Sequence, residues 1–118
     1  MTRESAQQLA QEWIAAWNAH DLERILEHYE EGVELISPVA AKLLTRKDGK
    51  VSGKSDLRSY FRRGLEAYPG LRFKLLEVFC GVSSVVLNYE NQRGTHTAEY
   101  MEISPDGKVS RVVANYRD

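Results

Sequence analysis

The sequence predicts an α+β fold in which three helices from the N-terminal half cover one face of an antiparallel sheet. The hydrophobic period is helical up to about residue 70 and then changes to alternation, which is typical of strands. Of the 118 residues, 42% are hydrophobic and 28% are charged, as in ordinary soluble globular proteins. A chain of this length can bury one core and leaves no room for a second. We therefore expect one domain spanning residues 1–118.

Two helices are predicted before residue 32. The first covers about residues 5–19, because its apolar positions recur at helical spacing and Ser5 followed by Gln8 fits a capping box. Asp21 can cap the second helix, which Gly32 would end. The apolar positions are Leu9, Trp13, Ala16 and Trp17 in the first helix, and Leu22, Ile25, Leu26 and Tyr29 in the second.

A short strand and a third helix are predicted next. Residues 33–36 form the strand, which Pro38 stops, and residues 45–53 read as a polar loop with two glycines. Ser55 is the expected cap of the third helix, which ends at Pro69-Gly70. The apolar face of this helix is Leu57, Tyr60, Phe61, Leu65 and Tyr68.

Four strands are predicted in the C-terminal part, near residues 72–80, 83–91, 94–104 and 108–116. SPDGK, residues 104–108, reads as the turn between the last two, so the four favour an antiparallel meander. Both faces of strand 94–104 are mixed: Thr97, Glu99 and Met101 alternate with His96, Ala98 and Tyr100. A sheet covered by helices on one side and by a second subunit on the other would produce this pattern, which predicts a homodimer.

Composition argues against several classes of protein. A net charge of -1 gives no general attraction to nucleic acid, so no nucleic-acid partner is expected. Eight of the 16 cations lie between residues 42 and 63; such a patch can attract an anionic ligand or RNA, but we interpret it as a solvated basic edge. GKVSGKS, residues 49–55, resembles a phosphate-binding loop, but its glycines are one residue too close and no buried parallel strand precedes it.

No metal or cofactor is expected either. His20, His28 and His96 have no metal-ligand spacing. The single cysteine, Cys80, lies in an apolar stretch, so we expect a buried thiol and a reducing compartment. Neither a signal peptide nor an apolar run of ~20 residues is present. These features favour a cytoplasmic protein that does not contact a membrane.

Two segments carry a resemblance to a known family. WNAHDLERILEHYEEGVELISP (residues 17–38) and GKSDLRSYFRRGLEAYPGLRF (residues 53–73), with the predicted order of elements, resemble the nuclear-transport-factor-2-like superfamily. Within it the chain is most similar to the SnoaL-like group, whose relatives include ketosteroid isomerases and polyketide cyclases. The resemblance spans about residues 10–116. It implies a cone-shaped sheet (a cystatin-like α+β barrel), an apolar pocket between helices and sheet, and a homodimer packed through the convex sheet face.

The resemblance to ketosteroid isomerases also implies roles for three positions. Ser37 stands where those enzymes hold a general-base aspartate, Trp13 at or near an oxyanion-hole tyrosine, and Glu99 at an aspartic acid kept neutral by its apolar surroundings. A serine hydroxyl without an adjacent base cannot abstract a proton from carbon, and an indole N–H can only donate. Steroid isomerase activity is therefore not expected, and Ser37 is interpreted as a pocket-wall or strand-end residue.

The candidate site rests on one catalytic and several binding residues. Glu99 is the candidate catalytic acid or base, although a mid-strand carboxylate can equally be ion-paired or face solvent. The candidate ligand-binding residues, each of which could instead only pack, are Trp13, Trp17, Tyr29, Ser37, Phe61, Met101 and Asn115. The leading hypothesis is binding of a small apolar molecule without an assigned activity. The alternatives are an isomerase, cyclase or dehydratase that uses Glu99, and a non-catalytic dimeric interaction module.

Overall fold

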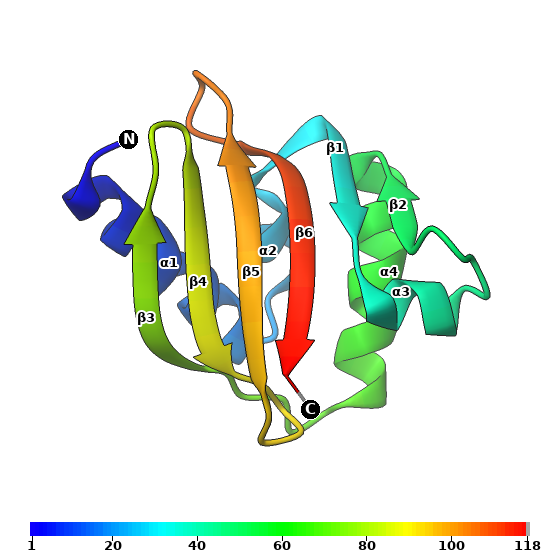
Figure 1. The fold of residues 1–118 in the computed structure, drawn as a ribbon. Coiled ribbons are helices and arrows are strands. Elements are labelled where there is room, and N and C mark those ends of the chain that lie inside the picture. The colour runs from blue at the N-terminus through cyan, green and yellow to red at the C-terminus, as the bar shows by residue number, and fades with distance from the viewer. Residues whose placement is uncertain (118) are drawn as a thin grey trace.

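The computed structural model describes residues 1–117. Ten helices and strands follow one another along this part of the chain (Figure 1). In order they are α1 (Arg3–Asn18), α2 (Leu22–Leu26), β1 (Tyr29–Ile36), α3 (Pro38–Leu43), β2 (Lys50–Ser52), α4 (Lys54–Ala67), β3 (Lys74–Cys80), β4 (Ser84–Glu90), β5 (His96–Ile103) and β6 (Val109–Arg117).

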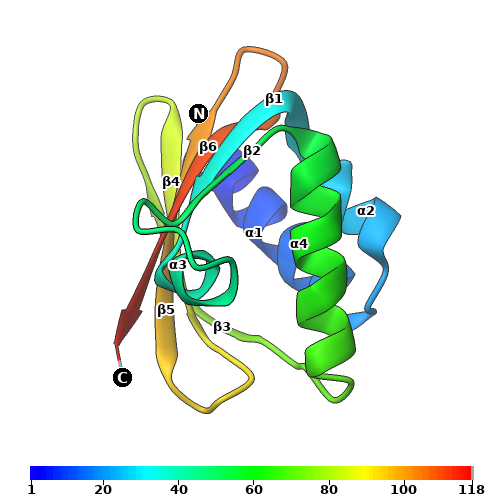
Figure 2. The ribbon, with the colours of Figure 1, turned by 90° about the vertical axis from the view of Figure 1, so that its right-hand side faces the viewer.

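The six strands form one curved, unclosed sheet in the order β2-β1-β6-β5-β4-β3. The predicted meander is confirmed, because β3, β4, β5 and β6 pair antiparallel in sequence. β1 lies parallel to β6 and antiparallel to β2. Figure 2 shows that α1, α2 and α4 lie on one side of the sheet, so its other face carries no helix. The α+β cone predicted from the sequence is therefore the fold of the protein.

The first helix begins earlier than predicted. Its N-cap is Thr2, whose hydroxyl accepts from the backbone N–H of Ser5, while the Ser5 hydroxyl binds back to Thr2. The predicted capping box from Ser5 to Gln8 was wrong, because serine at the third helical position closes the box instead. Trp13 and Trp17, one turn apart, both point into the core and are 2% and 7% exposed.

The second helix is shorter than predicted, and the prediction that it contains Tyr29 was wrong. α2 ends at Leu26, and Tyr29 is the first residue of β1, paired with Val109 of β6. Gly32 lies inside this strand and ends no helix. Pairing with a strand some 80 residues away decides this boundary, and that information is absent from the local period.

Pro38 begins a short helix as well as ending a strand. It occupies the first turn of α3, where its missing N–H costs nothing, and Ser37 is the N-cap. The predicted loop 45–53 contains the short strand β2. Gly53, with φ of 87°, is the N-cap of α4, so Ser55 lies within the helix and the prediction that it is the cap was wrong.

The last four strands match their predicted positions within two residues, and SPDGK forms the predicted turn, closed by bonds between Ser104 and Lys108. The prediction for Cys80 was wrong: its thiol is exposed, because it ends β3 at the edge of the sheet. Among residues 1–117, no helix combines the length and hydropathy needed to cross a membrane.

Candidate functional site

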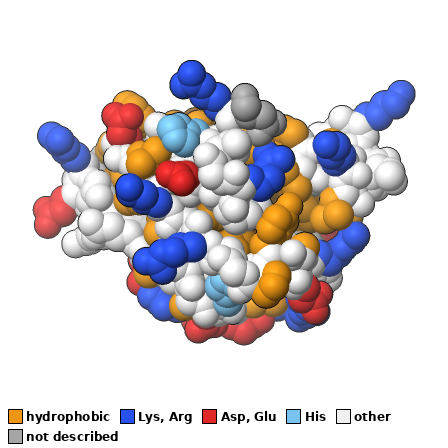
Figure 3. Space-filling view, turned by 90° about the horizontal axis from the view of Figure 1, so that it is seen from below, with side chains coloured by type: hydrophobic (Ala, Val, Ile, Leu, Met, Phe, Trp, Pro, Cys, Tyr) orange, Lys and Arg blue, Asp and Glu red, His pale blue; other side chains and the backbone are white. Residues whose placement is uncertain are grey.

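A cavity of about 360 Å³ lies between the helices and the inner face of the sheet. α1, α3 and α4 contribute side chains to one part of the wall, and β1, β4, β5 and β6 contribute to the other. Figure 3, seen from below, shows apolar side chains gathered where this end of the molecule is hollowed, with cationic side chains on the surface around them. The volume falls in the range of small-molecule sites.

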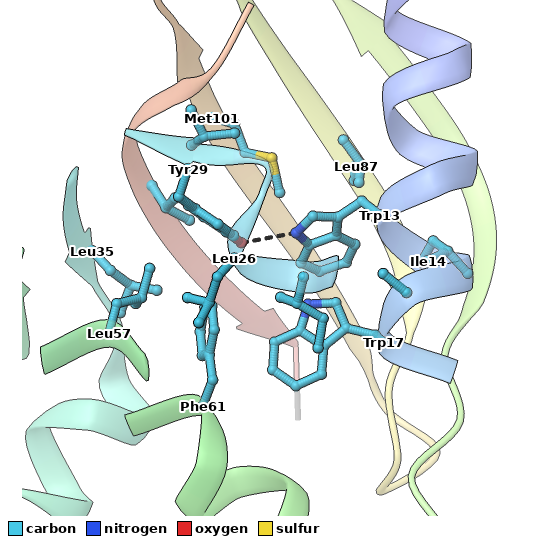
Figure 4. Close-up of a cluster of buried hydrophobic side chains, with 14 of the residues drawn as sticks. Trp13, Ile14, Trp17, Leu26, Tyr29, Leu35, Leu57, Phe61, Leu87 and Met101 are labelled. Carbon is cyan, nitrogen blue, oxygen red and sulfur yellow. Dashed lines mark hydrogen bonds between the residues drawn. The ribbon is translucent and has the colours of Figure 1, made fainter. Parts of the chain in front are cut away.

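Aromatic rings form much of the cavity wall. Figure 4 shows Trp13 and Trp17 of α1 on one side and Tyr29 and Phe61 on the other. The ring centroids of Trp17 and Phe61 are 4.8 Å apart in an edge-to-face contact, and those of Trp13 and Phe73 are 5.9 Å apart and nearly parallel. Large flat rings in mutual contact leave a wall that favours flat apolar ligands.

Glu99 of β5 is a buried carboxyl on this wall, with only 7% of the residue exposed. The hydroxyl of Tyr89 donates to its Oε1 at 2.8 Å. Its Oε2 has no hydrogen-bond partner among residues 1–117 and is left for a ligand or water. Burial raises the pKa of Glu99 to about 7, and the bond from Tyr89 only partly opposes this rise.

Four tyrosines surround this carboxyl: Tyr29, Tyr60, Tyr89 and Tyr116. Burial is the main cause that raises the pKa of each, and the negative charge of Glu99 adds to the rise in all four. Their hydroxyls therefore keep their protons at physiological pH and can donate hydrogen bonds. The arrangement places neutral donors around one acid that titrates near neutrality.

Trp13 connects the helix to this cluster. Its indole Nε1 donates to the hydroxyl of Tyr29 at 2.8 Å (Figure 4), so the Tyr29 oxygen acts as the acceptor. The hydrogen of this hydroxyl has no acceptor among the described residues. Trp17 differs, because its Nε1 is buried and has no hydrogen-bond partner within residues 1–117. The two tryptophans look alike in the sequence but only one is anchored by a hydrogen bond.

Ser37 combines both roles considered for it. It is 3% exposed, ends β1, and its Oγ accepts from the N–H of Val39 as the cap of α3. It also lines the cavity, where its hydroxyl partly offsets the rise in the pKa of Tyr60 and Tyr116. No base lies within hydrogen-bonding distance of Ser37 among the described residues. It is a polar wall residue.

Two predicted binding residues do not reach the cavity. Met101 is fully buried in the core, and Asn115 is exposed, with its amide bonded to the carbonyls of Ala98 and Val113. Tyr116, which does line the cavity, was missed. Strand alternation could have identified it, because Tyr116 and Ala114 share the inner face and Asn115 must then face outward.

Gly64 of α4 also lines the cavity, and it carries no side chain where one would fit. A Cβ built there meets no atom within 4 Å, and its φ is not in the left-handed region. Glycine within a helix costs ~1 kcal/mol relative to alanine. Since neither crowding nor backbone conformation requires glycine here, its effect is to leave space in the cavity.

No group of three or more His, Cys, Asp or Glu side chains within residues 1–117 is placed to hold a metal ion. Around Glu99, the described residues offer hydrogen bonding and proton transfer.

The family model for the SnoaL-like domain matches residues 10–117. The chain belongs to the SnoaL-like domain family. The structure of a SnoaL-like protein of unknown function from Burkholderia thailandensis is similar to this SnoaL-like domain, with 36% identity, a TM-score of 0.96 and coverage of 100% of this chain and 99% of that one. No curated protein matches the chain.

More distant structures share the fold of this SnoaL-like domain. A Kribbella flavida protein provisionally assigned as a ketosteroid isomerase has 18% identity, a TM-score of 0.75 and coverage of 98% of this chain and 79% of that one. TerC, co-crystallised with polyporic acid, has 18% identity, a TM-score of 0.75 and coverage of 96% and 92%. At this identity the likeness establishes the cone fold and leaves the activity open.

Proposed function

We propose that this SnoaL-like domain binds a small, largely apolar molecule in its cavity, with Glu99 as the polar anchor. The observation that carries the proposal is a carboxyl that is buried, bonded by Tyr89 on one oxygen and free on the other, inside an open aromatic cavity. Most buried side-chain oxygens have a hydrogen-bond partner, so an unpaired oxygen at a cavity wall favours a ligand or water there. The open volume favours this function over a non-catalytic interaction module with a filled interior.

Binding can be tested with N-phenyl-1-naphthylamine, a neutral apolar dye that fluoresces when it leaves water. We expect saturable binding to the native protein. Gly64→Leu, which places a side chain in the cavity from a position without close neighbours, should abolish this binding while the protein stays folded. Dye binding that is unchanged in Gly64→Leu would contradict the proposal, because the dye would then occupy another surface.

Proton transfer is the second candidate function. The favouring observation is the pKa of about 7 for Glu99, because a general acid or base works best when its pKa lies near the operating pH. Ionised, Oε2 can accept a proton from carbon next to a ligand carbonyl, and the hydroxyl of Tyr29 can donate to the oxygen on which charge develops. Such a step is shared by isomerases, cyclases and dehydratases.

Exchange of the α-protons of 2-tetralone, a bicyclic apolar ketone, in heavy water tests this second function. We expect exchange to be faster with the native protein than with Glu99→Gln by ~10²-fold or more, the usual contribution of general acid–base catalysis. Equal rates for the two proteins would show that Glu99 is a binding group only. Dye binding would then still support the first proposal.

We also propose a homodimer through the uncovered sheet face. An apolar row crosses five strands on this face, where directly paired residues lie side by side: Ile36, Val113, Tyr100, Val86 and Phe79. Phe79 alone is 53% exposed. Contiguous apolar side chains on a sheet without covering helices favour burial against a second copy.

A further inference from the structure

Among residues 1–117, the only side chains of the Asp, Glu, Lys, Arg and His types that line the cavity are Glu99 and Arg63. Arg63 lies on α4, one residue before Gly64, and is exposed. Whereas Arg58 of the same helix is paired with Glu23 at 2.9 Å, Arg63 has no ion pair or hydrogen bond among residues 1–117. The cavity thus has one buried acid and one free cation at its rim.

A second hollow, also of about 360 Å³, adjoins the cavity at Arg63. Arg63 and Tyr60 line both spaces. The second hollow adds Arg46 to its lining, together with the carboxylate of Asp56, which lies two helical turns before Arg63. The Arg63 guanidinium therefore stands where an apolar cavity opens onto a partly basic surface.

We propose that the natural ligand of the cavity is an organic anion, whose apolar body lies between the aromatic walls and whose carboxylate, sulfonate or similar group pairs with Arg63. This inference rests on the proposed binding function and adds the class of ligand. A guanidinium offers a planar pair of donors that matches such groups. Because Arg63 is exposed, the pairing contributes modestly to affinity and more strongly to the choice between charged and neutral ligands.

Two dyes that differ by one charged group provide the test. 8-Anilino-1-naphthalenesulfonate is N-phenyl-1-naphthylamine with an added sulfonate, so both present the same apolar rings. We expect Arg63→Ala to weaken binding of the sulfonate about two- to fivefold, in the range of one exposed ion pair, and to leave the neutral dye unchanged. Arg63→Lys should retain part of the preference, and added salt should reduce it.

Arg62→Ala is the matched control, because Arg62 is exposed on the same helix and lines neither space. An equal loss for both dyes in Arg63→Ala, or the same sulfonate loss in Arg62→Ala, would overturn the inference and leave the binding proposal intact. Unchanged binding of both dyes in Gly64→Leu would overturn the binding proposal and this inference with it. These outcomes distinguish a wrong class of ligand from a wrong binding site.

Discussion

The hydroxyl of Tyr89 on β4 donates a hydrogen bond of 2.8 Å to Oε1 of Glu99 on β5. In the sheet register Tyr89 pairs with Thr97 and Glu99 pairs with Leu87, so the two residues are diagonal neighbours on the inner face. The bond stabilises the charged form of a carboxyl whose burial favours the neutral form. The protonation state of Glu99 therefore depends on burial and on this contact, which act in opposite directions.

Removing the donor should shift the titration of Glu99. Tyr89→Phe is expected to raise the pKa of Glu99 above about 7, because the bond from Tyr89 is what lowers it. Carbon-13 NMR of the glutamate carboxyls over a pH titration measures this directly. Tyr100→Phe is the control, since Tyr100 lies on the outer face and binds Glu102. An unchanged or lower pKa in Tyr89→Phe would show that the bond does not hold the charge.

Glu99→Gln should change how stability depends on pH. Folding raises the pKa of Glu99 from 4.5 to about 7. The contribution of this carboxyl to the free energy of unfolding is therefore complete below about pH 4.5 and is lost as the pH rises through about 7. Each pKa unit is worth ~1.4 kcal/mol, so we expect Gln to be neutral at pH 4 and to stabilise by up to about 3 kcal/mol at pH 8. Chemical denaturation at both values measures the difference.

Glu77→Gln is the control for that experiment, because Glu77 is an exposed carboxyl without an ion pair among the described residues. It should alter stability equally at both pH values. If Glu99→Gln instead destabilises the protein more at pH 8 than at pH 4, the carboxylate is a stabilising charged group, and its description as a neutral acid at the cavity wall is wrong.

The two tryptophans of α1 should differ in their response to the same substitution. Trp13→Phe removes the donor to the buried hydroxyl of Tyr29, whereas Trp17→Phe removes an N–H that has no partner within residues 1–117. We expect Trp13→Phe to lower the free energy of unfolding by about 1–3 kcal/mol more than Trp17→Phe. In a Tyr29→Phe background the difference should disappear. A difference that persists there would assign it to packing.

Substitution by alanine should have opposite effects on stability at two glycines. Gly64→Ala is expected to stabilise the protein by about 0.5–1 kcal/mol, because it improves helix propensity in open space. Gly49→Ala should destabilise it by more than about 1 kcal/mol, because φ is 62° and the new Cβ would lie 2.5 Å from the Ser37 carbonyl oxygen. Thermal or chemical denaturation measures both. A destabilising Gly64→Ala would mean that the helix needs glycine at this position for its own structure.

The proposed dimer can be tested at the centre of the apolar row. Val86→Glu places a charge there and should convert a particle of twice 13.5 kDa into the monomer in sedimentation velocity. Val82→Glu changes the same residue type in the β3–β4 turn, where it is 91% exposed, and should leave the dimer intact. A native protein that sediments at 13.5 kDa at every concentration contradicts the dimer.

The sequence by itself determined the class of fold, the four C-terminal strands and the inward direction of Trp13 and Trp17. These features follow from local periodicity, since an apolar residue every 3.6 or 2 positions marks the buried side of a helix or strand. The mixed faces of β5 left open whether the carboxyl of Glu99 lies on the buried side. The hydrogen-bond partner and the pKa of this carboxyl could not be predicted from periodicity.

Only the tertiary structure decided which side chains meet. Tyr29 joins a strand because its backbone pairs with Val109, and Tyr116 lines the same cavity as Glu99 because β6 lies beside β5 in one particular register. Such contacts join residues far apart in the chain, and a shift of one position would turn Tyr116 outward and Asn115 inward. Periodicity specifies the buried face of each element. The pKa of Glu99 and the placement of Arg63 at the cavity rim without an ion pair among residues 1–117 depend on how these faces are assembled.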